Sequence, residues 1–308
     1  MNDILSVEAV CYKYKNNEVE ANHNISFRIN KGEIVGLFGP NGAGKTTLVR
    51  QICGTLRVQK GIIQVNNKNI SIQPKIISEV ISSLNQTMYM HRFLKPVEYI
   101  THTGIYRGMK PEIAKKQALQ LMEYFDLKNI SNNLLMNLSG GERRVVGFLA
   151  SIIGFRPFVV LDEPTNGLDS AGVIEIENLV LNLAKHENKT FIITSHILNQ
   201  VEKVCNRVGI LSKGIILSEG DVKTLLAAPT EQYVLELEQS INVDEISNLL
   251  HNLAKVISIQ DNKITVEIDN TNIGEISALL SNNHLNIRDI QKKTKDLEAY
   301  FMERLKIQ

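Results

Sequence analysis

The chain has 308 residues, of which 43% are hydrophobic and 22% are charged. This length suits one large domain or two moderate ones, and the apolar content favours a packed core over disorder. The formal net charge of +1 gives no reason to expect a nucleic-acid-binding surface. No apolar run approaches the roughly 20 residues of a membrane span, and the N-terminus lacks a signal pattern. We therefore expect a soluble protein that depends on a partner for any work at a membrane.

The cysteines Cys11, Cys53 and Cys205 are scattered along the chain. They show neither the spacing of a metal site nor the even number of a disulfide framework, which suits a reducing compartment. We expect all three to be small, buried hydrophobic side chains.

The first strong motif is GPNGAGKTT at residues 39–47, which follows the apolar run EIVGLF. The apolar run predicts a buried parallel strand, and TTLVRQICG predicts a helix that stops at Gly54. The motif fits G-x-x-x-x-G-K-[ST], a glycine-rich loop whose amide groups cradle phosphate oxygens at a helix N-terminus. We therefore predict that Lys45 binds the β- and γ-phosphates of a nucleotide and that the Thr46 hydroxyl binds Mg²⁺.

Residues 86–138 are predicted to be mostly helical, since PEIAKKQALQLMEYFDL repeats apolar residues at intervals of three and four.

The next motif, LSGGERRVVGFLASIIG at residues 138–154, predicts a helix that begins after Ser139, Gly140 and Gly141. Its glycine-rich N-terminus is a second anion site by the same physics. One nucleotide does not need two such sites far apart in one chain.

The sequence FVVLDEPTNGLD at residues 158–169 predicts a strand covered on both faces that ends in an acidic pair. Asp162 at this position can hold hydrated Mg²⁺ beside the glycine-rich loop. Glu163 is placed to orient or polarise a water that attacks the γ-phosphate.

In combination, these motifs resemble those of the nucleotide-binding subunits of ABC transporters, over roughly residues 5–221. The resemblance implies an α/β fold: a P-loop NTPase domain at residues 1–225 with an inserted helical subdomain at about residues 87–155. It implies ATP and Mg²⁺ as cofactors and ATP hydrolysis coupled to transport. It also implies a head-to-tail homodimer or heterodimer, in which the signature LSGGE of one subunit closes over the ATP of the other.

The resemblance further implies a transmembrane permease as partner, at the cytoplasmic face of the cell membrane. We expect residues 91–108 to contact that permease, and a solvated helical insertion is the alternative for any one residue. A P-loop kinase or GTPase would have no use for LSGGE. A soluble ABC-type ATPase that remodels nucleic acid or ribosomes is the main rival, but such proteins usually carry two cassettes or a coiled coil.

Several residue roles follow from the resemblance alone. Gln86 corresponds to the glutamine that senses Mg²⁺ and the transport partner, and His196, after the strand TFIIT, to the histidine that contacts the γ-phosphate. Asp169 corresponds to the residue that links the two sites of the dimer. Tyr14 corresponds to the aromatic residue that stacks on adenine, with Tyr12 as the competing choice.

The predicted catalytic residues are Glu163, His196 and Gln86, and the predicted metal ligands are Thr46, Gln86 and Asp162. The predicted nucleotide contacts are Tyr14, Gly39, Pro40, Asn41, Gly42, Ala43, Gly44, Lys45, Thr46, Thr47, Ser139, Gly140, Gly141, Glu142 and Asp169.

One residue departs from the family pattern, because Glu142 stands where Gln is usual. Ser139 and Glu142 also fit a capping box, which favours the start of the helix. A carboxylate near the partner's γ-phosphate repels it, so we expect a working site with weaker closure on ATP.

After about residue 221 the pattern changes to strand–helix–strand, repeated twice, which predicts a small α+β domain at residues 230–308 with a ferredoxin-like split arrangement. A last amphipathic helix is predicted in DLEAYFMERLK at residues 296–306. This region resembles the C-terminal extension of ABC ATPases that drive exporters of drugs, peptides, lipids or ions. Dimer support or regulation and simple stabilisation are equally compatible roles. We interpret the chain as the ATP-hydrolysing subunit of an exporter.

Overall fold

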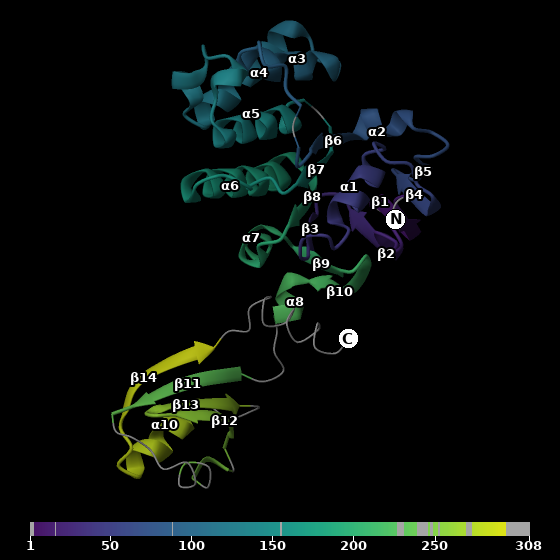
Figure 1. Cartoon of the computed structure of the whole chain (residues 1–308). Coiled ribbons are helices and arrows are strands. Elements are labelled where there is room, and N and C mark those ends of the chain that lie inside the picture. The colour runs from purple at the N-terminus through teal and green to yellow at the C-terminus, as the bar shows by residue number, and fades with distance from the viewer. Residues whose placement is uncertain are drawn as a thin grey trace. The chain divides into compact units, whose positions relative to one another are not determined.

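The computed structural model describes residues 3–15, 17–87, 89–154, 156–226, 231–238, 246, 249–251, 253–268 and 273–293. The chain divides into two compact units, Met1–Val222 and Lys223–Gln308 (Figure 1). The helix predicted at residues 296–306 lies outside the described residues.

The larger unit is built on a six-stranded sheet with the order β10-β9-β3-β8-β7-β6. Its strands are β3 (Ile34–Phe38), β6 (Ile81–Leu84), β7 (Phe158–Asp162), β8 (Thr190–Ser195), β9 (Arg207–Ser212) and β10 (Ile215–Asp221). All neighbouring strands are parallel except β10, which pairs antiparallel with β9. Every residue of β3, β7 and β8 is buried, which confirms that their apolar runs form strands covered on both faces.

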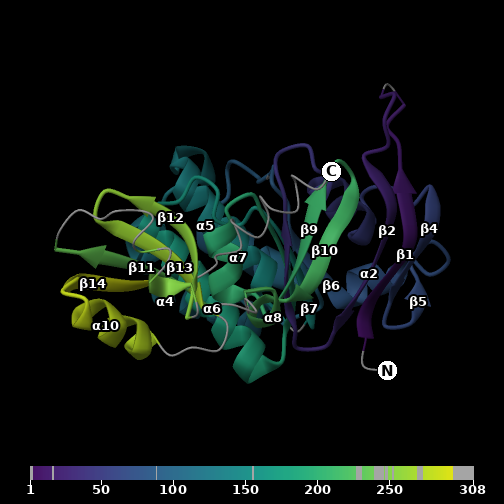
Figure 2. The same cartoon turned by 90° about the horizontal axis from the view of Figure 1, so that it is seen from below.

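A second, antiparallel sheet with the order β2-β1-β4-β5 was not predicted from the sequence. It comprises β1 (Asp3–Tyr12), β2 (Asn22–Asn30), β4 (Lys60–Val65) and β5 (Lys68–Asn69), seen together at one end of the larger unit in Figure 2. Buried residues of β1 and β2 share one hydrophobic core with residues of β3, β7 and β8. This sheet therefore supports one side of the loop that follows β3.

The helices of the larger unit are α1 (Lys45–Ile52), α2 (Lys75–Val80), α3 (Pro96–Tyr106), α4 (Pro111–Tyr124), α5 (Gly140–Ile152), α6 (Ser170–Glu187) and α7 (Leu198–Val204). Short 3₁₀ turns follow α4 at Leu127–Ile130 and Leu135–Asn137. Helix α8 (Val222–Leu226) begins at the last residue of the larger unit. Helices α3, α4 and α5 pack on one another and confirm the inserted helical subdomain (Figure 1). None of the described helices combines the length and apolar composition needed to cross a bilayer.

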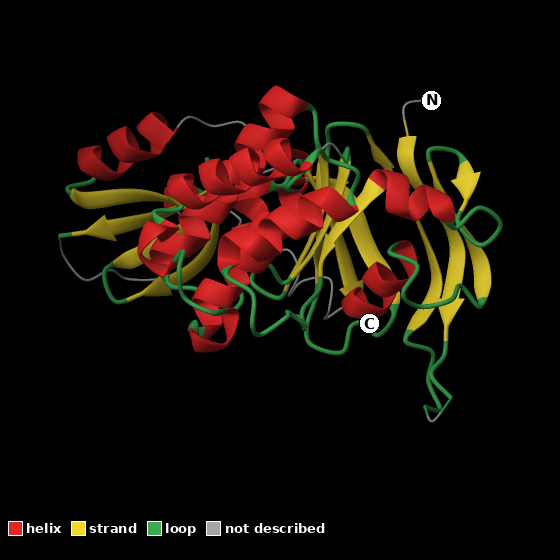
Figure 3. Cartoon of the chain, turned by 90° about the horizontal axis from the view of Figure 1, so that it is seen from above, coloured by secondary structure: helices red, strands yellow, loops and turns green. Residues whose placement is uncertain are grey.

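The smaller unit contains β11 (Glu231–Leu237), β12 (Lys255–Gln260), β13 (Lys263–Ile268), α10 (Ile273–Asn282) and β14 (Ile287–Lys293). Its sheet has the order β12-β13-β11-β14 with antiparallel neighbours, which is the order of the predicted split arrangement. Half of the first helix predicted there, at residues 243–254, lies outside the described residues. Ile276 and Leu280 of α10 join a core with the buried residues of the sheet. Figure 3 distinguishes helices and strands in both units by colour.

Candidate nucleotide-binding and hydrolysis site

A cleft of about 710 Å³ lies where the glycine-rich loop leaves β3 and enters α1. Its lining comes from the β1–β2 connection, the loop, the segment after β6, the end of β7 and the β9–β10 turn. The lining residues are Tyr14, Asn17, Val19, Glu20, Ala21, Asn41, Gly42, Ala43, Gly44, Lys45, Thr46, Thr47, Gln86, Glu163, Lys213 and Gly214.

Two glycines explain why the loop at residues 39–47 needs bare backbone. A Cβ at Gly44, which has φ 103°, would lie 2.4 Å from the carbonyl oxygen of Ala21 and from the side-chain amide of Asn22. A Cβ at Gly39 would lie 2.3 Å from the carbonyl oxygen of Leu211. These close approaches let α1 begin at Lys45, so the amide groups at its N-terminus face the cleft.

The ammonium group of Lys45 is fixed in position at the cleft. Its Nζ donates hydrogen bonds to the carbonyl oxygens of Gly39 at 2.6 Å and Pro40 at 3.2 Å. It also lies 3.6 Å from Oε1 of Glu163. Burial lowers the pKa of Lys45, and the neighbouring Glu163 carboxylate acts in the opposite direction. The ammonium group is thus positioned among carbonyl and carboxylate oxygens at the end of β3.

Asp162 and Thr46 meet at the floor of the site. The Thr46 hydroxyl donates to Oδ1 of Asp162 at 3.3 Å, and the Thr194 hydroxyl donates to the same oxygen at 2.6 Å. Asp162 is 2% exposed, so its carboxylate is oriented by these contacts rather than by water. Hydroxyl and carboxylate oxygens are donors that Mg²⁺ prefers, so the pair fits that ion. Sequence reasoning missed Thr194. Every residue of β8 is buried, so nothing in the local pattern distinguished this threonine from its neighbours.

Glu163 adopts a left-handed backbone conformation, with φ 52°, which is uncommon for a residue other than glycine. Its amide N–H holds this conformation by donating to the hydroxyl of Thr194 at 3.0 Å and to the carbonyl of Thr194 at 3.2 Å. Its Oε2 accepts a hydrogen bond from Nδ1 of His196 at 2.8 Å. Strained backbone of this kind persists only where the surrounding structure maintains it, and it is concentrated at functional sites. Here it turns the carboxylate toward Lys45 and His196.

Arg144 in α5 is a residue that sequence reasoning missed. It is 4% exposed, and its guanidinium group donates to backbone carbonyls of two separate loops, those of Asn85, Gln86, Asp162, Glu163 and Pro164. Burial lowers the pKa of Arg144, and the Asp162 and Glu163 carboxylates act against that shift. The side chain therefore ties the helical subdomain to the loops that carry Gln86 and Glu163. The only signal in the sequence was a second arginine followed by an apolar helix.

We predict that Arg144→Lys lowers kcat for ATP hydrolysis more than it raises KM, because one ammonium cannot span both loops as the planar guanidinium does. Carbonyls left without donors cost about 1–3 kcal/mol of folding stability. Steady-state kinetics well below the melting temperature check this prediction. Arg143→Lys is the matched control, since Arg143 donates to the Leu138 carbonyl within its own subdomain. Equal losses in the two variants would contradict a positioning role for Arg144.

Tyr14 and Gln86 both line the cleft. The Tyr14 hydroxyl hydrogen-bonds with the Thr47 hydroxyl at 3.2 Å, and the ring of Tyr12 packs edge-on against the Tyr14 ring at 4.8 Å. Tyr12 is not among the residues that line the cleft, so the geometry favours Tyr14 as the aromatic contact.

The signature residues lie apart from this cleft. Ser139 and Glu142 form the predicted capping box at the start of α5: the Glu142 amide donates to the Ser139 hydroxyl at 3.2 Å, and Oε2 of Glu142 accepts from the Ser139 amide at 2.7 Å. Ser139 and Gly140 are exposed, and Asp169 caps α6 by accepting from the Gly172 amide at 3.0 Å. These residues line no part of the 710 Å³ cleft in their own chain.

These features define a P-loop ATPase cassette: a glycine-rich loop of the phosphate-binding type between β3 and α1, an acidic pair at the end of β7, and the inserted helices α3–α5. Residues 22–166 match the protein family described as "ABC transporter". The chain is 33% identical over 220 residues to the lipopolysaccharide export system ATP-binding protein LptB of Haemophilus influenzae, covering 70% of this chain and 90% of that protein. It is 27% identical over 281 residues to the bacitracin transport ATP-binding protein BcrA of Bacillus licheniformis, covering 91% and 90%.

A solved structure, the dimeric ATP-binding cassette MJ0796 bound to ADP and Pi, shares the fold with a TM-score of 0.66 and 24% identity. It covers 71% of this chain and 98% of the MJ0796 chain. The chain belongs to the ATP-binding subunits of ABC transporters, and it is an ATP-binding ATPase.

Proposed function

We propose that this subunit powers an exporter through a separate transmembrane permease and works as a head-to-tail dimer with two composite ATP sites. The main support is the placement of two helix N-termini in one chain. The N-terminus of α1 faces the cleft with Lys45, whereas the N-terminus of α5 at Ser139–Gly141 is outside it and largely exposed. A second copy of the cassette would supply its α5 N-terminus to complete the first copy's cleft.

Within one cleft, each side chain has a role in hydrolysis. Lys45 and the amides of residues 41–47 bind the phosphates, and Tyr14 stacks on adenine. The Thr46 hydroxyl, the Asp162 carboxylate and Gln86 would hold Mg²⁺, which would neutralise negative charge on the phosphates. Glu163 orients and polarises the attacking water. His196 donates to Glu163 through Nδ1, and its other ring nitrogen, when it also carries a proton, can donate to the γ-phosphate.

The signature residues and Asp169 act across the dimer. Ser139, Gly140 and Gly141 offer a hydroxyl and helix amides to the partner's γ-phosphate. Glu142 brings a carboxylate to the same helix turn, and its Oε2 is already engaged by the Ser139 amide. Part of its charge is thereby offset inside its own chain, which supports a working site with weaker closure. Asp169 links the two sites of the dimer.

The permease contact is proposed at residues 91–108, around α3. Large apolar side chains are exposed there and just before it: Tyr89 is 93% exposed, Phe93 79% and Tyr106 89%. Such a gathering of exposed aromatic residues is typical of a protein–protein contact. An adjoining cleft of about 200 Å³ is lined by residues that include Tyr89, Tyr99 and Arg107. This surface would hold the subunit at the cytoplasmic face of the membrane.

Export is our proposed direction of transport, and the printed name of one relative supports it. LptB is named for lipopolysaccharide export and BcrA for bacitracin transport, and BcrA matches across most of both chains. We propose domain limits of 1–225 and 230–308, with the C-terminal unit as the extension found in exporter-type subunits. Support of the dimer or its regulation is the role that we propose for this unit, since no part of the predicted catalytic set falls in it.

The proposal is tested by capturing the tagged chain from detergent-solubilised membranes of its host and identifying bound proteins by mass spectrometry. We expect a polytopic membrane protein. A variant that combines Tyr89→Ala, Phe93→Ala and Tyr106→Ala should lose it while keeping its own ATPase activity. Ile72→Ala is the control, because Ile72 is 75% exposed outside this surface. Recovery of ribosomal proteins or nucleic acid instead of a permease would overturn the proposal.

A further inference from the structure

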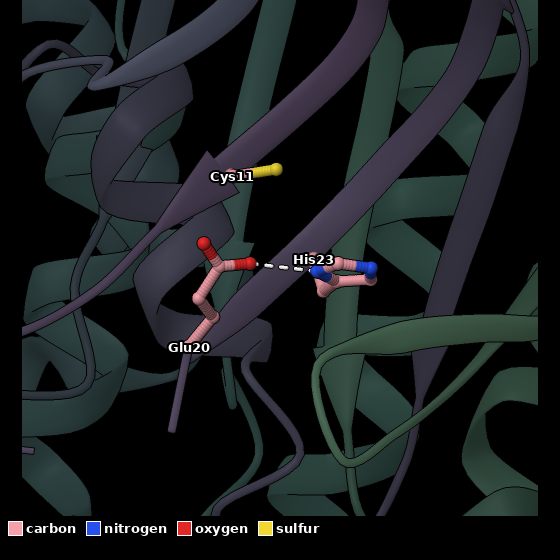
Figure 4. A group of neighbouring side chains, drawn as sticks. All are labelled: Cys11, Glu20 and His23. Atoms are coloured by element: carbon pink, nitrogen blue, oxygen red, sulfur yellow. Dashed lines mark hydrogen bonds and ion pairs between the residues drawn. The ribbon is translucent and has the colours of Figure 1, made fainter. Parts of the chain in front are cut away.

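Three potential metal ligands converge at the β1–β2 connection, as Figure 4 shows for Cys11, Glu20 and His23. The thiol sulfur, a carboxylate oxygen and an imidazole nitrogen all lie within 4.8 Å of one another. Nδ1 of His23 and Oε2 of Glu20 are 2.7 Å apart. Cys11 is partly exposed, which corrects the expectation that its side chain is buried. In the sequence, a loop separates Cys11 from Glu20 and His23, so no short motif indicated the cluster.

The backbone fixes the positions from which these side chains extend. Cys11 lies near the end of β1, and His23 lies near the start of β2, where the strand register shifts between Val10 and Tyr12. The Ala21 amide donates to the Tyr12 carbonyl at 2.7 Å, next to Glu20. The His23 amide donates to the Gly214 carbonyl at 2.7 Å. The cluster is therefore built on paired strands rather than on a free loop.

Cys11 also has a partner suited to a thiolate. The Asn24 amide donates to Sγ of Cys11 at 3.2 Å. Hydrogen bonds of this kind orient a ligating side chain and stabilise its charged form. Nothing in the nucleotide chemistry proposed above uses this contact.

We propose that Cys11, Glu20 and His23 form a binding site for Zn²⁺ or a chemically similar divalent cation. Zn²⁺ binds thiolate, imidazole and carboxylate at about 2.0–2.3 Å, and three protein ligands leave a fourth position for water. The thiolate and carboxylate together balance the charge of the ion, and the thiol proton leaves to solvent on binding. The three donor atoms lie within 4.8 Å of one another, so ion binding would require side-chain rotations to draw them to that distance from the metal. Mg²⁺ is excluded, because it prefers an octahedron of oxygen ligands.

The charges around the cluster set its expected strength. The ammonium groups of Lys13 and Lys60 also face Glu20 and oppose a cation. With three ligands and these neighbours, the site should bind more weakly than a closed structural site with four ligands.

The site would clamp a segment that lines the nucleotide cleft. Residues 12–19 stand between Cys11 and Glu20 in the sequence, and Tyr14, Asn17 and Val19 among them line the cleft. A bound ion would join both ends of this segment and restrict its motion. An effect on ATP affinity rests on the proposed role of Tyr14, whereas the metal site itself does not depend on that role.

Titration of the nucleotide-free full chain with Co²⁺, a spectroscopic probe for Zn²⁺ sites, tests the proposal. We expect one cobalt ion per chain with a thiolate-to-metal charge-transfer band, displaced by Zn²⁺ and not by excess Mg²⁺. Cys11→Ser should abolish the band, and its hydroxyl can still accept from the Asn24 amide. His23→Ala and Glu20→Gln should each weaken binding by at least about tenfold. Zn²⁺ should raise the melting temperature of the wild type and not that of Cys11→Ser.

Cys53→Ser and His186→Ala are matched controls outside the cluster and should keep the band and the affinity. Absence of a charge-transfer band in the wild type would overturn the proposal. So would a band that persists in Cys11→Ser, a band lost in Cys53→Ser, or an unchanged affinity in both His23→Ala and Glu20→Gln. Circular dichroism of each variant separates loss of ligand from loss of fold.

Discussion

Glu163→Gln is expected to keep ATP binding and to reduce ATP hydrolysis by about 100- to 10,000-fold, the usual contribution of a positioned general base. The amide nearly matches the carboxylate in size, and its oxygen can still accept from Nδ1 of His196. It cannot take a proton from the attacking water. The backbone of residue 163 is held by Thr194, so the substitution should leave the fold unchanged.

Because ATP then persists in the site, two Glu163→Gln chains should remain associated. Sedimentation with ATP and Mg²⁺ measures this association, and phosphate release measures hydrolysis. Glu177→Gln serves as the control, since Glu177 is a partly buried carboxyl group on α6. A Glu163→Gln variant that hydrolyses ATP at the normal rate, or that stays monomeric with ATP, would remove Glu163 from the proposed role.

Lys45→Ala is expected to weaken ATP binding by on the order of 10- to 100-fold, since a hydrogen bond to a charged group contributes about 1.5–3 kcal/mol. The lost group is a cation that the loop carbonyls of Gly39 and Pro40 hold beside the cleft. Its removal also breaks the 3.6 Å ion pair with Glu163, which keeps its hydrogen bond to His196. Hydrolysis should fall at least as far as binding. Equilibrium binding of a fluorescent ATP analogue and steady-state ATPase rates check both effects.

Lys213→Ala is the control that distinguishes the positioned ammonium group of Lys45 from any positive charge near the cleft. Lys213 also lines the cleft, but it is exposed on the β9–β10 turn. We expect a much smaller loss of affinity in this variant, because water screens an exposed charge. Comparable losses at the two lysines would mean that the loop geometry around Lys45 has no special part in binding ATP.

The strands that carry the site were predictable because their signal is local. Continuous apolar runs mark β3 and β7, and in a parallel sheet such runs are buried on both faces. The helix after Gly44 and the capping box of Ser139 and Glu142 were predictable for a similar reason. Both depend on residues within one turn of chain, so the sequence contains the whole interaction.

The contacts that orient the site were not predictable, because their partners are distant in sequence. In the sequence, Arg144 cannot be distinguished from any other helical arginine. Its role appears only in the structure, where α5 packs beside the loops at residues 85–86 and 162–164. Thr194 is one of several buried residues in β8 until that strand pairs with β7 and brings its hydroxyl to Asp162. The left-handed conformation of Glu163 is likewise accompanied by hydrogen bonds from its amide to Thr194, which is distant in sequence.

By itself the sequence determined the P-loop fold, the order of its motifs, the ferredoxin-like unit and the class of chemistry, since each follows from a periodicity or a short spacing. Only the tertiary structure decided which side chains surround the cleft and that α5 begins outside it. It also decided that the β1–β2 sheet brings Cys11, Glu20 and His23 together. The physical reason is that chain pairing and core packing, which act between residues far apart in sequence, set these juxtapositions, while local patterns set only the elements.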